Sequence, residues 1–197
     1  MRSDMEVLQA DSSGEILNIS HTWSGSGRKK LTISDNIVGL SCAGSDSMKN
    51  QLVEIDMYGS RLSSIPDDNY SGCEKLTDAT FSPNLKMVGD RAFMNCENLR
   101  NVSLLNSTDH VVYVLGESAF ENTGIETMVV SLSGSSFDTY FGYRCFAECK
   151  NLRSVYLAKS TYLADSMFEG CSNLRSVTLN NYHSYVGKQS FKDCTSL

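Results

Sequence analysis

The side chains of this chain with the greatest capacity for chemistry are its seven cysteines, and their spacing indicates what they do. Five of them recur at one position of a repeated pattern, namely Cys73, Cys96, Cys149, Cys171 and Cys194. A column of cysteines at one position is typical of a small side chain packed in a core, whereas a disulfide framework pairs different positions. Stacked repeats would bring neighbouring cysteines near bridging distance, but parallel side chains disfavour a bond. We therefore expect reduced, buried thiols.

The remaining residues give little support to a metal site or a catalytic centre. His21, His110 and His183 are scattered, and none lies near a pair of cysteines, as a zinc site would require. Asp109-His110 is the one pair that suggests a hydrolase triad, and it falls in a variable loop. The acidic residues form no calcium loop of the Asp-x-Asp-x-Asp-Gly type. We expect no catalytic residues, no metal and no cofactor.

The cysteines belong to a sequence repeat that covers most of the chain. Each copy is marked by an aromatic anchor three residues before the cysteine position. The anchors are Tyr70, Phe93, Phe120, Phe146, Phe168 and Phe191, spaced 22 to 27 residues apart. A repeat of this length indicates a solenoid, because one copy is too small to bury its apolar face without neighbours.

Each repeat is expected to contain three parts. An apolar residue such as Val88 lies five positions before the anchor, and the glycine after it suggests a bend with unusual backbone angles. These glycines are Gly89, Gly116, Gly142 and Gly187. The segment from anchor to cysteine predicts a single turn of α or 3₁₀ helix. The pattern L-x-x-V-x-L then predicts a strand with one buried face. Its central residues would form one buried column: Ile55, Ala79, Val102, Met128, Val155 and Val177.

Both ends of the chain depart from the repeat. Residues 1–35 predict a β-hairpin cap, with strands at Glu15–Trp23 and Arg28–Ser34 around a Ser/Gly turn. Residues 36–57 resemble a degenerate first repeat, so that the repeats run from 36 to 197. The last copy stops at Leu197, on the first strand position. Because an uncapped coil exposes its apolar side, we expect a longer protein, self-association or another covering chain.

The motif G-x-x-A-F-x-x-C-x-x-L-x-x-V-x-L, as in Gly89 with Ala92-Phe93 followed by Cys96 and Leu99, resembles the BspA-like (Treponema-type) leucine-rich repeat family. The resemblance covers about residues 60–197. It implies a repeat solenoid, mainly β with short helical turns, coiled right-handedly with a parallel sheet on the concave face. It also implies a non-enzymatic adhesion or interaction protein of the cell surface or extracellular space. The chain departs from the family pattern at Thr123-Gly124, after Leu104, and in lacking a proline after the strand.

Two ladders of outward-facing residues are candidates for binding. Tyr140, Tyr162 and Tyr185 each precede an apolar residue expected to be buried, so strand alternation places the tyrosines outside. Exposed, aligned tyrosine offers contact area at a low cost in entropy. The second ladder is Arg100, Arg153 and Arg175, with Glu126 between the first two, and Tyr156 is a further candidate. The alternative for the tyrosines is that they pack against neighbouring loops. The alternative for the arginines is that they form a solvated face.

Composition narrows the class of partner. The net charge of −6 disfavours nucleic acid, and no apolar run is long enough to span a bilayer. The segment MRSDMEVLQADSS has no apolar core of signal-peptide type. We therefore expect a binding module for a protein or glycan. The alternative is a structural component of a virion or secretion particle, which the missing signal favours, and a virion or cytoplasmic location stays open beside the cell surface.

Overall fold

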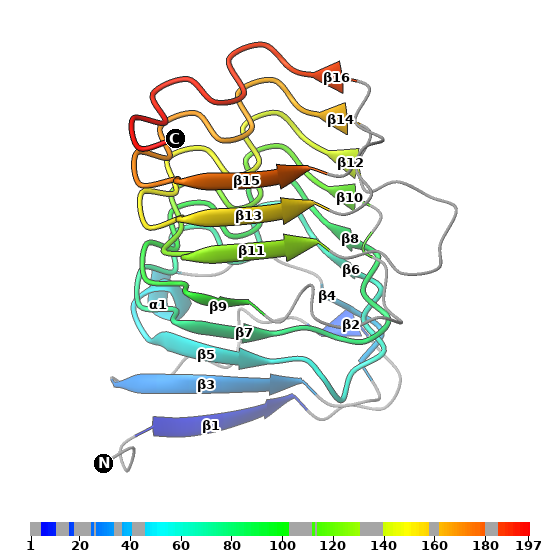
Figure 1. Ribbon diagram of the computed structural model, residues 1–197. Helices are drawn as coiled ribbons and strands as arrows, with labels where there is room; N and C mark the ends of the chain where they lie inside the picture. The colour runs from blue at the N-terminus through cyan, green and yellow to red at the C-terminus, as the bar shows by residue number, and fades with distance from the viewer. Residues whose placement is uncertain are drawn as a thin grey trace.

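The computed structural model describes residues 5–10, 16–17, 25, 27–33, 37–40, 46–102, 112, 114–130, 140–157, 162–179 and 185–197. These residues form a parallel-strand β-solenoid in which successive coils of the chain stack on one another (Figure 1). Every recorded strand pair is parallel, because each strand reaches its neighbour only after a full coil. The only helix among the described residues is the four-residue α1 (Asp46–Lys49).

The longer strands form one side of the stack. Five of them make one sheet, β1 (Met5–Ala10), β3 (Arg28–Ile33), β5 (Leu52–Asp56), β7 (Asp78–Thr80) and β9 (Asn101–Val102). Three more make the next sheet, β11 (Thr127–Val130), β13 (Ser154–Leu157) and β15 (Ser176–Leu179). Ile55 lies beside Ala79 and Ala79 beside Val102, while Met128, Val155 and Val177 align in the second sheet. The predicted alignment is therefore confirmed within each sheet, although Val102 and Val177 are only half-buried.

The shorter strands form a second side, seen at the right of Figure 1. They are β2 (Ile16–Leu17), β4 (Gly39–Leu40), β6 (Ser64–Ile65), β8 (Met87–Val88), β10 (Val114–Leu115), β12 (Tyr140–Phe141), β14 (Tyr162–Leu163) and β16 (Tyr185–Val186). Within them β6, β8, β10 and β12 make one sheet, and β14 pairs with β16. Each two-residue strand alternates an outward side chain with an inward one, as Tyr140 and Phe141 show.

The aromatic anchors stack through the middle of the solenoid. Their order is Tyr70, Phe93, Phe120, Phe146, Phe168 and Phe191. Successive ring centroids lie 5.2–5.9 Å apart and the rings are nearly parallel. Aromatic pairs of this geometry add stabilisation beyond that of the buried area. The spacing also requires neighbouring coils to hold the same register, so the stack couples each coil to the next.

The segment from anchor to cysteine is a series of tight turns, and the prediction of a helical turn is wrong. Arg91 and Asn95, two residues before and after Phe93, have φ values of 52° and 62°. Left-handed residues at these positions interrupt any right-handed helix. The Cys96 N–H closes a turn on Phe93 O at 3.1 Å, whereas the Phe93 N–H donates to Ala119 O of the next coil at 2.8 Å. The backbone here therefore bonds partly within a turn and partly between coils.

The repeated glycines are needed for close approach between coils. Gly142 does not have the positive φ that the predicted bend would need, and neither do Gly89, Gly116 and Gly187. A Cβ placed on Gly142 would lie 2.4 Å from the backbone nitrogen of Glu117 in the preceding coil. The equivalent Cβ on Gly116 would lie 2.6 Å from Asp90 N. The prediction of unusual angles is thus wrong, and contact with the neighbouring backbone excludes a side chain instead.

The N-terminal strands pair in parallel, so the predicted antiparallel hairpin is wrong. β3 occupies most of the range Arg28–Ser34, but its partner is β1, paired from Met5 with Arg28 to Ala10 with Ile33. β2 pairs in parallel with β4 rather than with β3. Alternating apolar residues indicate a strand but not its partner, and here the partner lies one coil away. The division into an N-terminal cap (1–35) and repeats (36–197) stays a prediction.

The column of cysteines is buried except at its last member, the half-buried Cys194, and its thiols also make hydrogen bonds. The six described cysteines are all unbridged, and Cys73, Cys96, Cys149 and Cys171 are fully buried. Cys96 Sγ donates to Tyr70 O at 3.2 Å, and Cys171 Sγ donates to Phe146 O at 3.2 Å. Each of these two thiols therefore bonds the carbonyl of the anchor one coil earlier. Cysteine suits this position because it is small, tolerates an apolar core and still offers a weak donor.

Thiol titration is expected to show few reactive groups in the native protein. Burial raises the pKa of Cys73 to about 12, so almost none of this thiol is the reactive thiolate near neutral pH. Cys194, which is only partly buried, should react first among the described cysteines. After denaturation without reductant all seven cysteines should react with an aromatic disulfide reagent. A shortfall of two, four or six thiols in the denatured sample would reveal disulfides and contradict this account.

Candidate binding surfaces

The tyrosine ladder lies on the outer side of the short strands. Tyr140, Tyr162 and Tyr185 are 59%, 39% and 45% exposed, as strand alternation predicts. Tyr162 lies beside Tyr185 in the pairing of β14 with β16. Phe141 and Leu163 behind them are buried, whereas Val186, expected to be buried, is 52% exposed. Val186 belongs to β16, whose only recorded neighbouring strand is β14, so one side of it lacks a covering coil within the described chain.

Two of these tyrosines are stacked on one another. The ring centroids of Tyr162 and Tyr185 are 4.9 Å apart, with an angle of 5° between the ring planes. Each ring thus covers one face of the other. Desolvation raises the pKa of Tyr162, and the nearby Asp165 carboxylate adds to the rise. The phenol is therefore neutral at physiological pH and remains able to donate a hydrogen bond.

The ladder continues below Tyr140 as an apolar strip. Tyr140 lies beside Val114 in β10, and Val114 lies beside Met87 in β8. Met87 is 43% exposed and Val114 is half-buried. β12 and β14 are neighbours, so the strip and the stacked pair follow one another along the solenoid. Met87 and Val114 thus extend the tyrosine ladder, which consists of Tyr140, Tyr162 and Tyr185.

The arginine ladder is aligned in part. The Arg153 N–H donates to Glu126 O at 2.8 Å and the Arg175 N–H donates to Arg153 O at 2.9 Å, so these three residues lie in one column. Arg100 occupies the same repeat position beside β9, in the other sheet, and its N–H donates to Thr77 O. All four side chains are exposed, and within the described chain none of them forms an ion pair. Glu126 is not seen to neutralise its neighbours.

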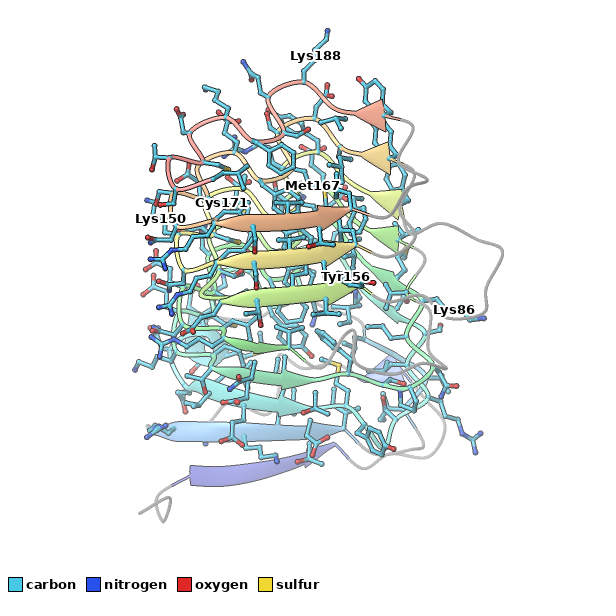
Figure 2. All side chains as sticks on the ribbon, in the orientation of Figure 1. Lys86, Lys150, Tyr156, Met167, Cys171 and Lys188 are labelled. Atoms are coloured by element: carbon cyan, nitrogen blue, oxygen red, sulfur yellow. The ribbon has the colours of Figure 1, made fainter. Side chains whose placement is uncertain are left out.

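Tyr156 lies on a separate surface, the outer face of β13 (Figure 2). It is 44% exposed and lies beside Val129 of β11 and Thr178 of β15. The next outward row of the same sheet consists of Thr127, Ser154 and Ser176. The sheet therefore brings Tyr156 together with hydroxyl groups and one valine, and not with the tyrosine ladder.

A ladder of alternating charges, which we did not predict, links four coils at their turns. Arg144 contacts Glu121 Oε1 at 2.8 Å through Nη2 and Glu169 Oε2 at 2.9 Å through Nη1. Lys192 Nζ then contacts Glu169 Oε1 at 2.6 Å. The Lys192 hydrogen bond lowers the pKa of Glu169, and Glu121 raises that of Arg144. Every charged side chain of this ladder contacts one or two side chains of opposite charge. The ladder therefore holds the coils together and leaves little unpaired charge for a ligand.

Other candidates from the sequence receive no structural support. Asp109-His110 lies outside the described residues, as do the three histidines. Among the described residues no three His, Cys, Asp or Glu side chains converge as metal ligands would. The described helix is also far too short to cross a membrane.

Comparison with known structures identifies the fold. A leucine-rich repeat protein from Bacteroides ovatus has 25% identity over 85% of this chain, with a TM-score of 0.58. This chain spans about half of that protein, 47% of its length. The T. pallidum leucine-rich repeat protein has 22% identity over 87% of this chain and 81% of its own, also with a TM-score of 0.58. The pneumococcal vaccine antigen PcpA, 14% identical over 91% of this chain and 62% of its own, has a TM-score of 0.52.

A search of curated protein sequences finds no match to the chain. A family model, however, agrees with the structural similarity. The model of the BspA type leucine-rich repeat region matches residues 63–197 in six copies. That range contains all six aromatic anchors, the cysteine column and the repeated glycines. It also agrees with the parallel stacking of coils and with the family resemblance of the motif. The chain therefore belongs to the BspA-type leucine-rich repeat family.

Proposed function

We propose that this chain is a non-enzymatic binding module that docks a protein partner on the tyrosine ladder, in adhesion or another protein–protein interaction. Membership of the repeat family supports a binding module. The observation that carries the choice of surface is the stacked, exposed pair Tyr162 and Tyr185. Their rings are held in place before binding, so docking on them costs little conformational entropy.

The geometry of the pair favours a protein over a glycan at this surface. A sugar ring binds tyrosine by lying flat on an aromatic face, and the two facing sides of Tyr162 and Tyr185 are closed to it because the ring centroids are 4.9 Å apart. The exposed surface of these tyrosines is continued along the solenoid by the apolar side chains of Val114 and Met87. Such a strip suits a partner with apolar side chains and backbone hydrogen-bonding groups, as hot spots at protein interfaces commonly have.

The proposed location is the cell surface or the extracellular space. Proteins with BspA-type repeats are often exposed on surfaces, and a relative of the same fold, PcpA, is a pneumococcal vaccine antigen. Protease treatment of intact source cells tests this part of the proposal. Loss of the protein from intact cells supports a surface location. Full protection in intact cells together with digestion in lysates would contradict it.

The partner should be lost when the ladder is removed. The variant Tyr140→Ala/Tyr162→Ala/Tyr185→Ala is expected to bind at least roughly 30-fold more weakly, because one aromatic hot spot alone contributes about 2 kcal/mol. Its melting temperature should change little, since these side chains are exposed. To capture the partner, a photoreactive phenylalanine replaces Tyr162. The same replacement of Tyr58, an exposed residue outside the ladder, is the control. The affinity of the purified partner is then measured by calorimetry.

The matched control is Arg100→Ala/Arg153→Ala/Arg175→Ala, which removes the other ladder and leaves the tyrosines intact. We expect this variant to bind the captured partner with nearly wild-type affinity. If the arginine variant loses binding and the tyrosine variant retains it, the contact surface is the arginine ladder and the proposal fails.

A further inference from the structure

One coil of the solenoid is shorter than the others at its turn. The other copies have two residues between the cysteine and the strand leucine, whereas Gly124 alone separates Thr123 from Ile125. In the other copies the leucine N–H closes a turn on the cysteine carbonyl, as Leu99 does on Cys96 at 2.9 Å and Leu152 on Cys149 at 3.0 Å. Ile125 has no such bond. The coil containing Thr123 therefore has a shorter turn than its two neighbours.

A polar notch lies at this shorter turn. A cavity of about 250 Å³ opens there, lined by Glu97, Asn122, Thr123, Glu148, Lys150 and Asn151. Glu97 belongs to the turn of the preceding coil, while Lys150 and Asn151 belong to the turn of the following coil. The shorter turn still packs on the preceding coil, where a Cβ on Gly124 would lie 2.5 Å from Glu97 O, and the notch opens among the side chains that line it. None of the six described lining residues is apolar.

Asn151 is left without its usual partner by the same deletion. At the equivalent position Asn98 Nδ2 donates to Glu74 O at 2.7 Å, and Asn173 Nδ2 donates to Lys150 O at 2.7 Å. Each acceptor is the residue that follows the cysteine position one coil earlier. That turn is one residue short in the coil of Thr123, and the Asn151 carboxamide has no side-chain hydrogen bond within the described chain. Its donor and acceptor are free to meet a ligand.

The other walls are held in position and offer both donors and acceptors. Asn122 Nδ2 donates to Asn95 Oδ1 at 3.0 Å and to Glu97 Oε1 at 3.1 Å, which fixes Asn122 and Glu97 together. Lys150 Nζ lies 3.5 Å from Glu148 Oε2. At the floor the buried Thr123 hydroxyl donates to Phe120 O at 2.9 Å. Carboxylates, amides and an ammonium group therefore surround one narrow space.

We propose that this notch binds one neutral or amino-bearing pyranose unit of a glycan. Sugar hydroxyl groups both donate and accept hydrogen bonds, so they can satisfy a mixed set of carboxylates, amides and an ammonium group. A peptide would find no apolar pocket for an anchoring side chain here. Glu97, Glu148 and Lys150 carry a net charge of −1, which disfavours an acidic sugar.

This inference is independent of the tyrosine ladder. The notch lies on the turns of the solenoid, whereas the tyrosines lie on the short strands. A cation is a poorer occupant, because no three metal-ligating side chains converge among the described residues. Membership of the repeat family accounts for the stacked coils. The notch is instead a feature of one sequence repeat, the one that contains Thr123, whose turn is one residue shorter than those of the others.

The experiment is an NMR titration of the ¹⁵N-labelled chain with four free sugars: glucose, galactose, N-acetylglucosamine and glucosamine. At least one is expected to cause saturable shifts confined to the amides of residues 95–98, 121–126 and 148–152. Asn151→Ala should weaken this binding by roughly fivefold or more, the effect of losing one hydrogen bond. Asn173→Ala, at the equivalent position one coil later, is the matched control and should bind as the wild type does.

A second variant fills the notch. Insertion of one asparagine between Gly124 and Ile125 restores the Cys-x-x-Leu spacing as Thr-Gly-Asn-Ile, and should abolish the sugar shifts while the fold is retained. The proposal is overturned if none of the four sugars gives a saturable shift, or if the insertion variant binds as the wild type does. It is also overturned if N-acetylneuraminic acid binds more tightly than the neutral sugars. The tyrosine variant should bind sugar normally, so failure here leaves the docking proposal intact.

Discussion

Replacing Val155 with aspartate is expected to unfold the protein or to lower its melting temperature severely. Val155 is 2% exposed in β13 and lies between Met128 and Val177 in the register of the sheet. A buried carboxylate without a partner costs several kcal/mol, and a domain of this kind has only about 5–15 kcal/mol of stability in all. Thermal unfolding followed by circular dichroism provides the measurement.

The neighbouring residue supplies the control for this change. Tyr156→Asp introduces the same charge one position later in the same strand, but its side chain is 44% exposed. We expect that variant to lose at most about 1 kcal/mol of stability, as exposed substitutions usually do. If Val155→Asp melts at the wild-type temperature, or if Tyr156→Asp has the lower melting temperature of the two, then the inward and outward faces of β13 are assigned the wrong way round.

Replacing Gly142 with alanine is expected to cost about 3 kcal/mol or more of stability, because the added methyl overpacks a rigid contact. Its Cβ would lie 2.4 Å from Glu117 N and 2.5 Å from Gly116 C, both backbone atoms of the preceding coil. No flexible side chain can move aside there. The Gly142 N–H also donates to Leu115 O at 2.8 Å, and separating the coils would lengthen this bond. Chemical denaturation gives the change in the free energy of unfolding.

Gly59→Ala is the matched control for Gly142→Ala. The nearest atom to a Cβ on Gly59 is Ile33 O at 3.9 Å, an ordinary contact, and its φ is not left-handed. This substitution should therefore be neutral or slightly stabilising, since alanine has less conformational freedom to lose than glycine. Equal stabilities for the two variants would mean that the coils are not packed at the distances described.

The features that could be predicted from sequence are those that repeat. The anchors, the cysteine column and the central residues of the strands recur at matched spacing, so their stacking follows from the period alone. Strand alternation was enough to place Tyr140 outside and Phe141 inside. The mutual stacking of Tyr162 and Tyr185 could not be predicted in this way, because it depends on side-chain rotamers as well as on strand register.

The features that sequence reasoning missed depend on what the neighbouring coil contributes. The sequence around Gly142 suggests that this glycine makes a bend. The structure shows that it is glycine because the backbone of Glu117, in the preceding coil, leaves no room for a side chain. The bond from Cys96 to Tyr70 O and the ion pairs of Arg144 likewise join residues more than twenty positions apart. At the N-terminus the strand β3 was recognised, but its partner β1 was not, because local patterns do not identify partners one coil away.

The measurement that tests the docking proposal most directly is tyrosine footprinting with and without the captured partner. In the free protein the exposed tyrosines among the described residues, Tyr58, Tyr140, Tyr143, Tyr156, Tyr162 and Tyr185, should all be acetylated by N-acetylimidazole, while Tyr70 is buried and should not react. In the complex we predict protection of Tyr140, Tyr162 and Tyr185, with Tyr58 and Tyr156 still reactive. Protection of Tyr156 while the ladder tyrosines remain reactive would contradict the proposal and assign the partner to the long strands.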